Sequence, residues 1–133
     1  MKIVLDTNVL VSGIFFSGPP RRILDAWTEG VIQFVVSVPI LEEYRRVATE
    51  LEKQYPTVNI GPIFDFLLVH AEITFPRALP AQVSPDPEDE KFIECALSAG
   101  IKLIVSGDKD LLGVSGYEGI RVLRPRAFVE RYL

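Results

Sequence analysis

Two aspartates each follow a short, unbroken run of branched apolar residues. Asp6 comes directly after Ile3-Val4-Leu5, and Asp108 follows Leu103-Ile104-Val105 after only Ser106-Gly107. Such runs are typical of buried parallel strands, and in open α/β sheets the ligand site lies beyond the carboxyl ends of the strands. Two carboxylates brought together there repel each other unless a positive charge lies between them. A divalent cation is the simplest such partner, so the pattern predicts a metal-dependent active site.

These apolar runs alternate along the chain with segments of helical periodicity. Strands are expected over residues 2–6, 33–36, 72–75, 102–105 and 121–123. Helices are expected over about 8–16, 21–29, 38–55, 60–70 and 88–99 and from Pro125 onward, with a glycine-containing loop over 106–120. Alternation of this kind implies α/β architecture: a three-layer α/β/α sandwich around a mostly parallel five-stranded sheet.

Helical phase brings two further acids toward the same region. In the helix that Ser37 is expected to cap, Glu43 lies at the border of the apolar stripe, whereas Glu42 points nearly opposite it, into solvent. In the helix over 88–99, Asp89 falls on the buried face, whereas Glu90 and Glu94 project away from it. Glu43 and Asp89 are therefore expected at the same rim as the two strand-end aspartates.

Each acid also has a purely structural explanation. Asp86 suits an N-cap with Pro87 next to it, and a helix dipole favours a carboxylate at Asp89. Asp6 and Asp108 suit turns after strands. Capping accounts well for Asp86, but it does not require the buried phase of Asp89, which favours a metal ligand there.

Composition narrows the class of protein. A chain of 133 residues fits one domain over 1–133, and its positive mean hydropathy of +0.25 indicates apolar surface that meets a partner. A net charge of −4 argues against a nucleic-acid coat protein, although the arginine pairs Arg21-Arg22 and Arg45-Arg46 suit either solvent or phosphate.

The single cysteine and the single histidine exclude two other kinds of site. Cys95, among apolar neighbours, is expected in the core, and one cysteine cannot form an internal disulfide. His70 is expected to be structural, and no His/Cys cluster is present for zinc. The reduced cysteine, the absence of a signal-peptide pattern and the absence of a membrane-spanning run predict a cytoplasmic protein.

Four segments, in this order and spacing, resemble a PIN domain: Asp6-Thr7-Asn8-Val9-Leu10, Leu41-Glu42-Glu43-Tyr44-Arg45-Arg46-Val47, Asp86-Pro87-Glu88-Asp89 and Val105-Ser106-Gly107-Asp108-Lys109-Asp110-Leu111-Leu112. The chain is similar to the small bacterial and archaeal group of VapC-like toxins from toxin–antitoxin pairs. The resemblance implies a ribonuclease that depends on Mg²⁺ or Mn²⁺, with RNA as substrate and with a cognate antitoxin and a second copy of the chain as partners.

The resemblance also implies roles for individual residues. Asp6 and Asp108 are expected to hold the principal metal ion, Asp89 to complete its shell, and Glu43 to bind a second ion or orient the attacking water. Asp110 is an auxiliary acid. The polar residues expected to support the carboxylates are Thr7, Asn8 and Ser106; related chains often carry threonine in place of Ser106, and the hydroxyl is retained.

Three alternatives remain open at this stage. A phospho-receiver-like signalling domain also gathers acids at strand ends, and Lys109 is placed for its lysine. An aspartyl phosphatase needs a second acid where Asp6-Thr7-Asn8 supplies asparagine. The third alternative is an inactive PIN fold that only binds partners, for which Ile14, Phe15 and Phe16 are candidate contacts if the core does not bury them.

Overall fold

The computed structural model describes residues 1–133 and contains one sheet of five parallel strands. The order across the sheet is β3-β2-β1-β4-β5. In the register of the central pair, Val4 lies opposite Ile104 and Leu5 lies opposite Val105. The strands are β1 (Lys2–Leu5), β2 (Gln33–Val36), β3 (Glu72–Ile73), β4 (Leu103–Val105) and β5 (Arg121–Leu123).

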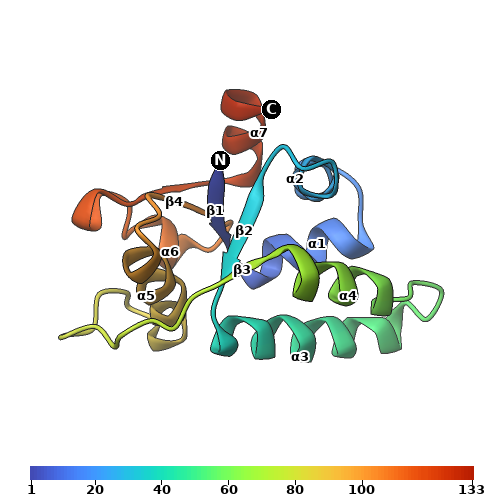
Figure 1. Cartoon of the computed structure of the whole chain (residues 1–133), viewed down its shortest axis with the longest axis horizontal. Coiled ribbons are helices and arrows are strands. Elements are labelled where there is room, and N and C mark those ends of the chain that lie inside the picture. The colour runs from blue at the N-terminus through green and yellow to red at the C-terminus, as the bar shows by residue number, and fades with distance from the viewer.

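Helices cover both faces of this sheet, as Figure 1 shows. Helix α5 contacts β1, β2 and β4 from one side, while α1 and α2 pack against each other on the opposite side. The predicted three-layer α/β/α sandwich is therefore confirmed, with every strand pair parallel. The helices are α1 (Thr7–Phe15), α2 (Pro19–Thr28), α3 (Val38–Gln54), α4 (Gly61–His70), α5 (Glu90–Ala99), α6 (Lys109–Leu112) and α7 (Pro125–Tyr132), with the 3₁₀ turns η1 (Pro87–Asp89) and η2 (Tyr117–Gly119).

The central strands are buried on both faces, which explains their continuous apolar sequences. Every side chain of Ile3-Val4-Leu5 and of Phe34-Val35-Val36 is fully buried. Trp27 from α2 stacks on Phe34, with 4.6 Å between the ring centroids. Parallel strands covered by helices on both sides cannot alternate polar and apolar residues, so the apolar runs mark these strands in the sequence.

The expected element boundaries hold to within about two residues, with four corrections. The expected loop over 106–120 contains α6 and η2, because the Asp108 side chain accepts a hydrogen bond from the Leu111 amide and caps a short helix. The strand expected to reach Phe75 ends at Ile73. Ser37 makes no capping hydrogen bond, and its hydroxyl is buried without a partner. Helix α2 begins at Pro19, earlier than expected, because proline suits the first helical turn.

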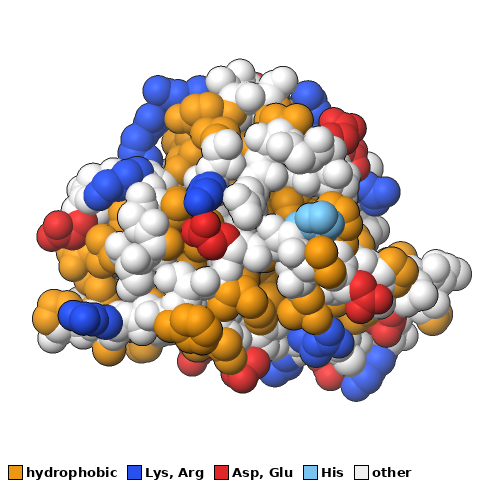
Figure 2. All heavy atoms as spheres, in the orientation of Figure 1, with side chains coloured by type: hydrophobic (Ala, Val, Ile, Leu, Met, Phe, Trp, Pro, Cys, Tyr) orange, Lys and Arg blue, Asp and Glu red, His pale blue; other side chains and the backbone are white.

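The surface carries apolar side chains between the charged ones (Figure 2). Of the three candidate partner contacts, Ile14 is buried in the core, Phe15 is half-buried and Phe16 is exposed. The most exposed large apolar side chain is Phe75, at 82%. Cys95 lies in the core as predicted. None of the helices combines the length and the apolar character needed to cross a membrane.

Candidate active site

The strand order reverses between β1 and β4. From β1 the chain adds β2 and β3 on one side, and it then returns to place β4 and β5 on the other side. Such a switch point opens a crevice beyond the carboxyl ends of the two central strands, and ligands of open α/β sheets bind there. Asp6 directly follows β1, and Asp108 lies three residues after the end of β4. The topology therefore delivers both strand-end acids to this crevice.

A cavity of about 220 Å³ lies at this position. Its lining contains all four acids that the sequence singled out, together with Thr7 and Asn8. The four come from the end of β1, from α3, from η1 and from the segment after β4. The lining residues are Asp6, Thr7, Asn8, Glu43, Arg46, Val47, Asp86, Glu88, Asp89, Phe92 and Asp108. Sequence segments up to a hundred residues apart thus contribute carboxylates to one small space.

Ser106 joins the two strand-end acids. Its hydroxyl donates to Asp6 Oδ2 at 2.6 Å and accepts a hydrogen bond from the backbone amide of Asp108 at 2.9 Å. Ser106 is fully buried. One hydroxyl therefore orients the Asp6 carboxylate and fixes the backbone position of Asp108 at the same time.

Ser84 makes the corresponding link on the other side of the cavity. Its hydroxyl donates to Asp89 Oδ2 at 3.0 Å and accepts from the backbone amide of Asp86 at 3.3 Å. Asp86 in turn accepts a hydrogen bond from the Glu88 amide, as expected of an N-cap. The capping role of Asp86 is thus confirmed, and its side chain also lines the cavity.

Glu43 has a cationic partner as well as a hydroxyl partner. Its Oε2 accepts a hydrogen bond from the Thr7 hydroxyl, and its Oε1 accepts one from Lys91 Nζ at 2.6 Å. Arg46 Nη2 lies 3.9 Å from the same Oε1. The predicted contrast within α3 is confirmed, because Glu42 is exposed while the Glu43 side chain is only 14% exposed.

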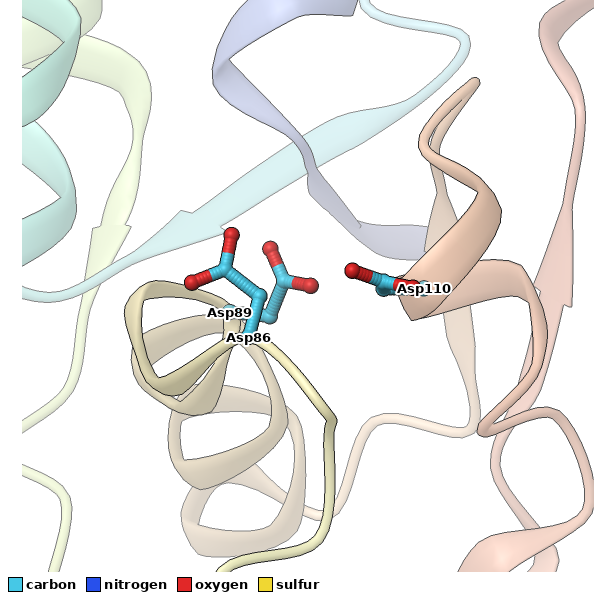
Figure 3. A group of neighbouring side chains, drawn as sticks. All are labelled: Asp86, Asp89 and Asp110. Atoms are coloured by element: carbon cyan, nitrogen blue, oxygen red, sulfur yellow. The ribbon is translucent and has the colours of Figure 1, made fainter.

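Asp110 adds a further carboxylate beside η1. Oxygen atoms of Asp86, Asp89 and Asp110 all lie within 4.8 Å of one another. In Figure 3, Asp86 and Asp89 project from the start of the α5 segment, and the Asp110 carboxylate points toward them from α6. Asp86 and Asp89 therefore belong both to this group and to the cavity that Asp6 and Asp108 line.

Burial and mutual repulsion disfavour the charged forms of these acids. The pKa of Asp89 is raised to about 7, mainly by burial and then by its contact with Asp108, although the hydrogen bond from Ser84 acts in the opposite direction. Burial also raises the pKa of Asp6, and the charges of Asp108 and Glu43 add to this, although hydrogen bonds from Ser106 and the Thr7 backbone act in the opposite direction. Carboxylates held together at such a cost are typical of functional sites.

The donor set fits Mg²⁺ or Mn²⁺. All the candidate ligands are carboxylate oxygens, which hard divalent cations prefer. Neither Cys95, buried in the core, nor His70, exposed on α4, lines the cavity. A bound cation would also relieve the repulsion that raises the pKa values of Asp6 and Asp89. Asp86, Asp89 and Asp110 have oxygen atoms close enough together to hold such an ion, and Asp6 and Asp108 line the same cavity as Asp86 and Asp89.

Sequence reasoning missed three residues of this site. Ser84 lies in the proline-rich connector, and nothing in its local sequence marks a buried hydroxyl. Lys91 looks like an ordinary helix-surface lysine, but its spacing from Glu88 (three residues) places the two on the same helix face. For Asp86, the sequence favoured capping over a place in the site. In each case the missing information was which distant segment lies opposite.

Glu90 and Glu94, which the sequence places away from the buried face of α5, are half-buried and have backbone partners. Glu90 accepts hydrogen bonds from the backbone amides of Val83 and Ser84, and Glu94 accepts one from Leu79. These two acids hold the connector that carries Ser84 and Asp86 against α5.

The fold and the acidic cavity together define an α/β nuclease-like domain. The PIN domain family model matches residues 2–110, which is most of the chain, and the chain therefore belongs to the PIN domain family. A PIN domain in general implies nuclease activity, typically with divalent metal ions. Among curated proteins, no relative matches the sequence. The strand order also differs from the 2-1-3-4-5 order of phospho-receiver domains, which removes that alternative.

Proposed function

We propose that this protein is a Mg²⁺- or Mn²⁺-dependent endoribonuclease, with Asp6, Glu43, Asp89 and Asp108 as its catalytic acids. The observation that carries the proposal is the convergence of carboxylates from four separate segments on one cavity at the switch point of the sheet. Supporting residues are Thr7, Asn8, Ser106 and Asp110. All but Ser106 and Asp110 line the cavity, and those two contact or adjoin its acids.

The arrangement assigns distinct tasks to the side chains. A divalent ion held by Asp6, Asp89 and Asp108 would supply an activated water and neutralise charge on the phosphate. Ser106 keeps the Asp6 carboxylate oriented toward the cavity. Glu43, which lines the same cavity, would orient the attacking water and accept its proton. Its hydrogen bond from Thr7 fixes the direction of its carboxylate.

Arg46 is the residue placed to contact the RNA backbone. Its side chain is mostly exposed and lines the cavity beside Glu43. Its neighbour Arg45 stacks over the Phe64 ring, 4.8 Å from the centroid, and is used to pack α3 on α4. The small, acid-lined space suits a flexible strand whose backbone can be splayed, as in single-stranded or loop RNA. Arg46→Gln should therefore weaken RNA binding and reduce its salt dependence.

The decisive test is cleavage of single-stranded RNA with Mg²⁺, with Mn²⁺ and with a chelator. We expect cleavage only in the presence of a metal ion, and none by Asp108→Asn. Asp65→Asn is the matched control, because Asp65 is an exposed acid on α4 outside the cavity. Full activity in Asp108→Asn, or in the chelator, would refute the proposal.

We also propose that the protein acts in the cytoplasm as the toxin of a toxin–antitoxin pair, with a cognate antitoxin and with dimerisation. Support comes from the ordered motifs that resemble this group of PIN domains. Induced expression should arrest growth of the host cell, and Asp108→Asn should relieve the arrest. Light scattering of the purified chain measures whether it forms the dimer. Growth at the normal rate with active wild-type protein present would contradict the toxin assignment.

A further inference from the structure

Lys91 forms the most buried ion pair of the molecule. Its Nζ lies 2.6 Å from Glu43 Oε1 and 3.1 Å from Glu88 Oε2, and its side chain is only 17% exposed. By comparison, the Lys53–Glu50 pair on the same α3 helix that carries Glu43 has side chains exposed by 68% and 66%. An exposed pair of that kind contributes little to stability. Lys91 is thus a cation built into the wall of the acidic site.

The ammonium group divides the acids of the cavity into two sets. Asp6, Asp89 and Asp108 accept hydrogen bonds from serine hydroxyls or backbone amides, Asp89 also contacts Asp108, and no Lys or Arg forms an ion pair with any of the three. The charge of Glu43 is compensated by Lys91, and Glu43 also accepts a hydrogen bond from Thr7, which leaves one acceptor site on each carboxylate oxygen for water. Only the aspartates therefore have uncompensated charge to offer a metal ion.

A second divalent ion that used Glu43 as a ligand would need the position that Lys91 takes. In sites with two metal ions, the ions lie about 3.5–4 Å apart and share carboxylates. An ion bound to Glu43 would stand next to the Lys91 ammonium, and the two positive charges would repel each other. The Lys91 ammonium donates to two glutamates at once, to Glu43 at 2.6 Å and to Glu88 at 3.1 Å, so it is held in this position from both sides.

We propose that Lys91 takes the place of a second metal ion beside Glu43: it holds Glu43 as a positioning residue and keeps a second divalent cation from binding there, so that the aspartates alone bind the metal. This inference rests on the metal dependence of the proposed function. It favours one of the two roles expected for Glu43, orienting the attacking water, over the other, binding a second ion. Glu43 then acts on the attacking water and is not a metal ligand.

The test counts bound ions. Mn²⁺ is titrated into metal-free protein, free Mn²⁺ is followed by electron paramagnetic resonance, and folding is checked by circular dichroism. Wild type should bind one Mn²⁺ per chain. Lys91→Met and Lys91→Gln should each bind two, because Glu43 is released. Lys91→Arg should keep the count at one, since it retains the charge. Lys53→Met is the matched control. It removes an exposed lysine whose pair with Glu50 has the same i,i+3 spacing as the Lys91–Glu88 pair.

A double variant identifies the ligand of the additional ion. Glu43→Gln combined with Lys91→Met should return the count to one. Two ions in wild type, none in wild type, or an unchanged single ion in both folded Lys91→Met and Lys91→Gln would each overturn the inference. RNA cleavage is measured on the same samples, so that a failure of the ribonuclease proposal is distinguished from a failure of the inference about Lys91. A protein with one Mn²⁺ and no cleavage would refute the ribonuclease proposal while leaving the role of Lys91 intact.

Discussion

Ser84 and Ser106 make the same pattern of hydrogen bonds to the acids of the cavity, but different parts of the fold hold the two serines in place. Ser106 and Ser84 each donate to one aspartate and accept the backbone amide of another. The Ser106 link spans residues a hundred positions apart, and its distances are the shorter ones, 2.6 and 2.9 Å against 3.0 and 3.3 Å. The Ser84 link joins residues within one local segment.

The difference lies in what surrounds each serine. Ser106 follows β4, which pairs with β1 and β5, and its own amide bonds to the Leu123 carbonyl. Ser84 lies in a connector without regular structure, held by hydrogen bonds to Glu90 and Glu94 on α5. A sheet ladder therefore fixes one half of the site, and side chains fix the other half. We expect substitutions in the half held by the sheet, around Ser106, to have larger effects than substitutions in the half held by side chains, around Ser84.

The largest expected effect is a difference in RNA cleavage between a variant of Asp6, in the sheet half, and a variant of Asp86, in the connector half. Asp6→Asn should reduce RNA cleavage by at least about a thousandfold, because a catalytic metal supplies several kcal/mol and each 1.36 kcal/mol is tenfold in rate. Asp86→Asn should reduce it by only about tenfold, because asparagine keeps the N-cap. Single-turnover cleavage rates measure both. Equal losses in the two variants would contradict the comparison.

The next effect concerns pH and the shared acid Asp89. Its pKa is about 7 in the folded protein against 3.8 ordinarily, so between these values the folded state binds more protons than the unfolded chain. The stability of the metal-free protein should therefore fall as pH rises through this window and level off above it. Asp89→Asn should lose most of this slope, with a smaller slope from Asp6 left. Thermal denaturation in chelator across the window measures it, and an unchanged slope in the variant would be the contrary result.

A third prediction concerns the sheet side of the cavity. Ser106→Ala leaves a buried carboxylate oxygen of Asp6 and the amide of Asp108 without their partner. The expected loss of stability is about 1–3 kcal/mol, the cost of unsatisfied buried groups. Chemical denaturation against Ser17→Ala, an exposed serine, provides the measurement. Ser106→Thr should restore stability if the hydroxyl is what matters, and failure of this rescue would point to tight packing instead.

The smallest expected effect is that of Ser84→Ala. The connector can shift and admit water to Asp89 and to the Asp86 amide, so we expect a loss of about 1 kcal/mol, typical of one net hydrogen bond. The same denaturation experiment measures it. A loss as large as that of Ser106→Ala would show that the connector is as firmly fixed as the sheet, and the contrast between the two halves would then be abandoned.

Sequence reasoning went furthest where geometry is periodic. Apolar runs located β1, β2 and β4, and helical phase distinguished Glu43 from Glu42 and placed Asp89 on the buried face. These predictions succeeded because the buried faces of helices and strands produce regular patterns of apolar residues in the sequence. Their catalytic roles remain a proposal for experiment.

The connector side was less accessible to prediction. Contacts of Ser84 and Lys91 depend on how a proline-rich segment and two helices approach each other, and no periodic pattern encodes that approach. Helix α6 was missed because four residues are too few to show helical periodicity. The prediction that Ser37 caps α3 was wrong, because a residue type that suits the N-cap position does not always make the capping hydrogen bond.

The outer strands of the sheet have a consequence for how copies of this protein can associate. β3 has two residues with Pro76 shortly after it, and β5 has three residues with Pro125 beginning the next helix. Short margins bounded by proline offer an incoming strand few free amides and carbonyls. Growth of the sheet from one molecule into the next is therefore disfavoured, which guards against aggregation. Any ordered assembly is left to helices and side chains.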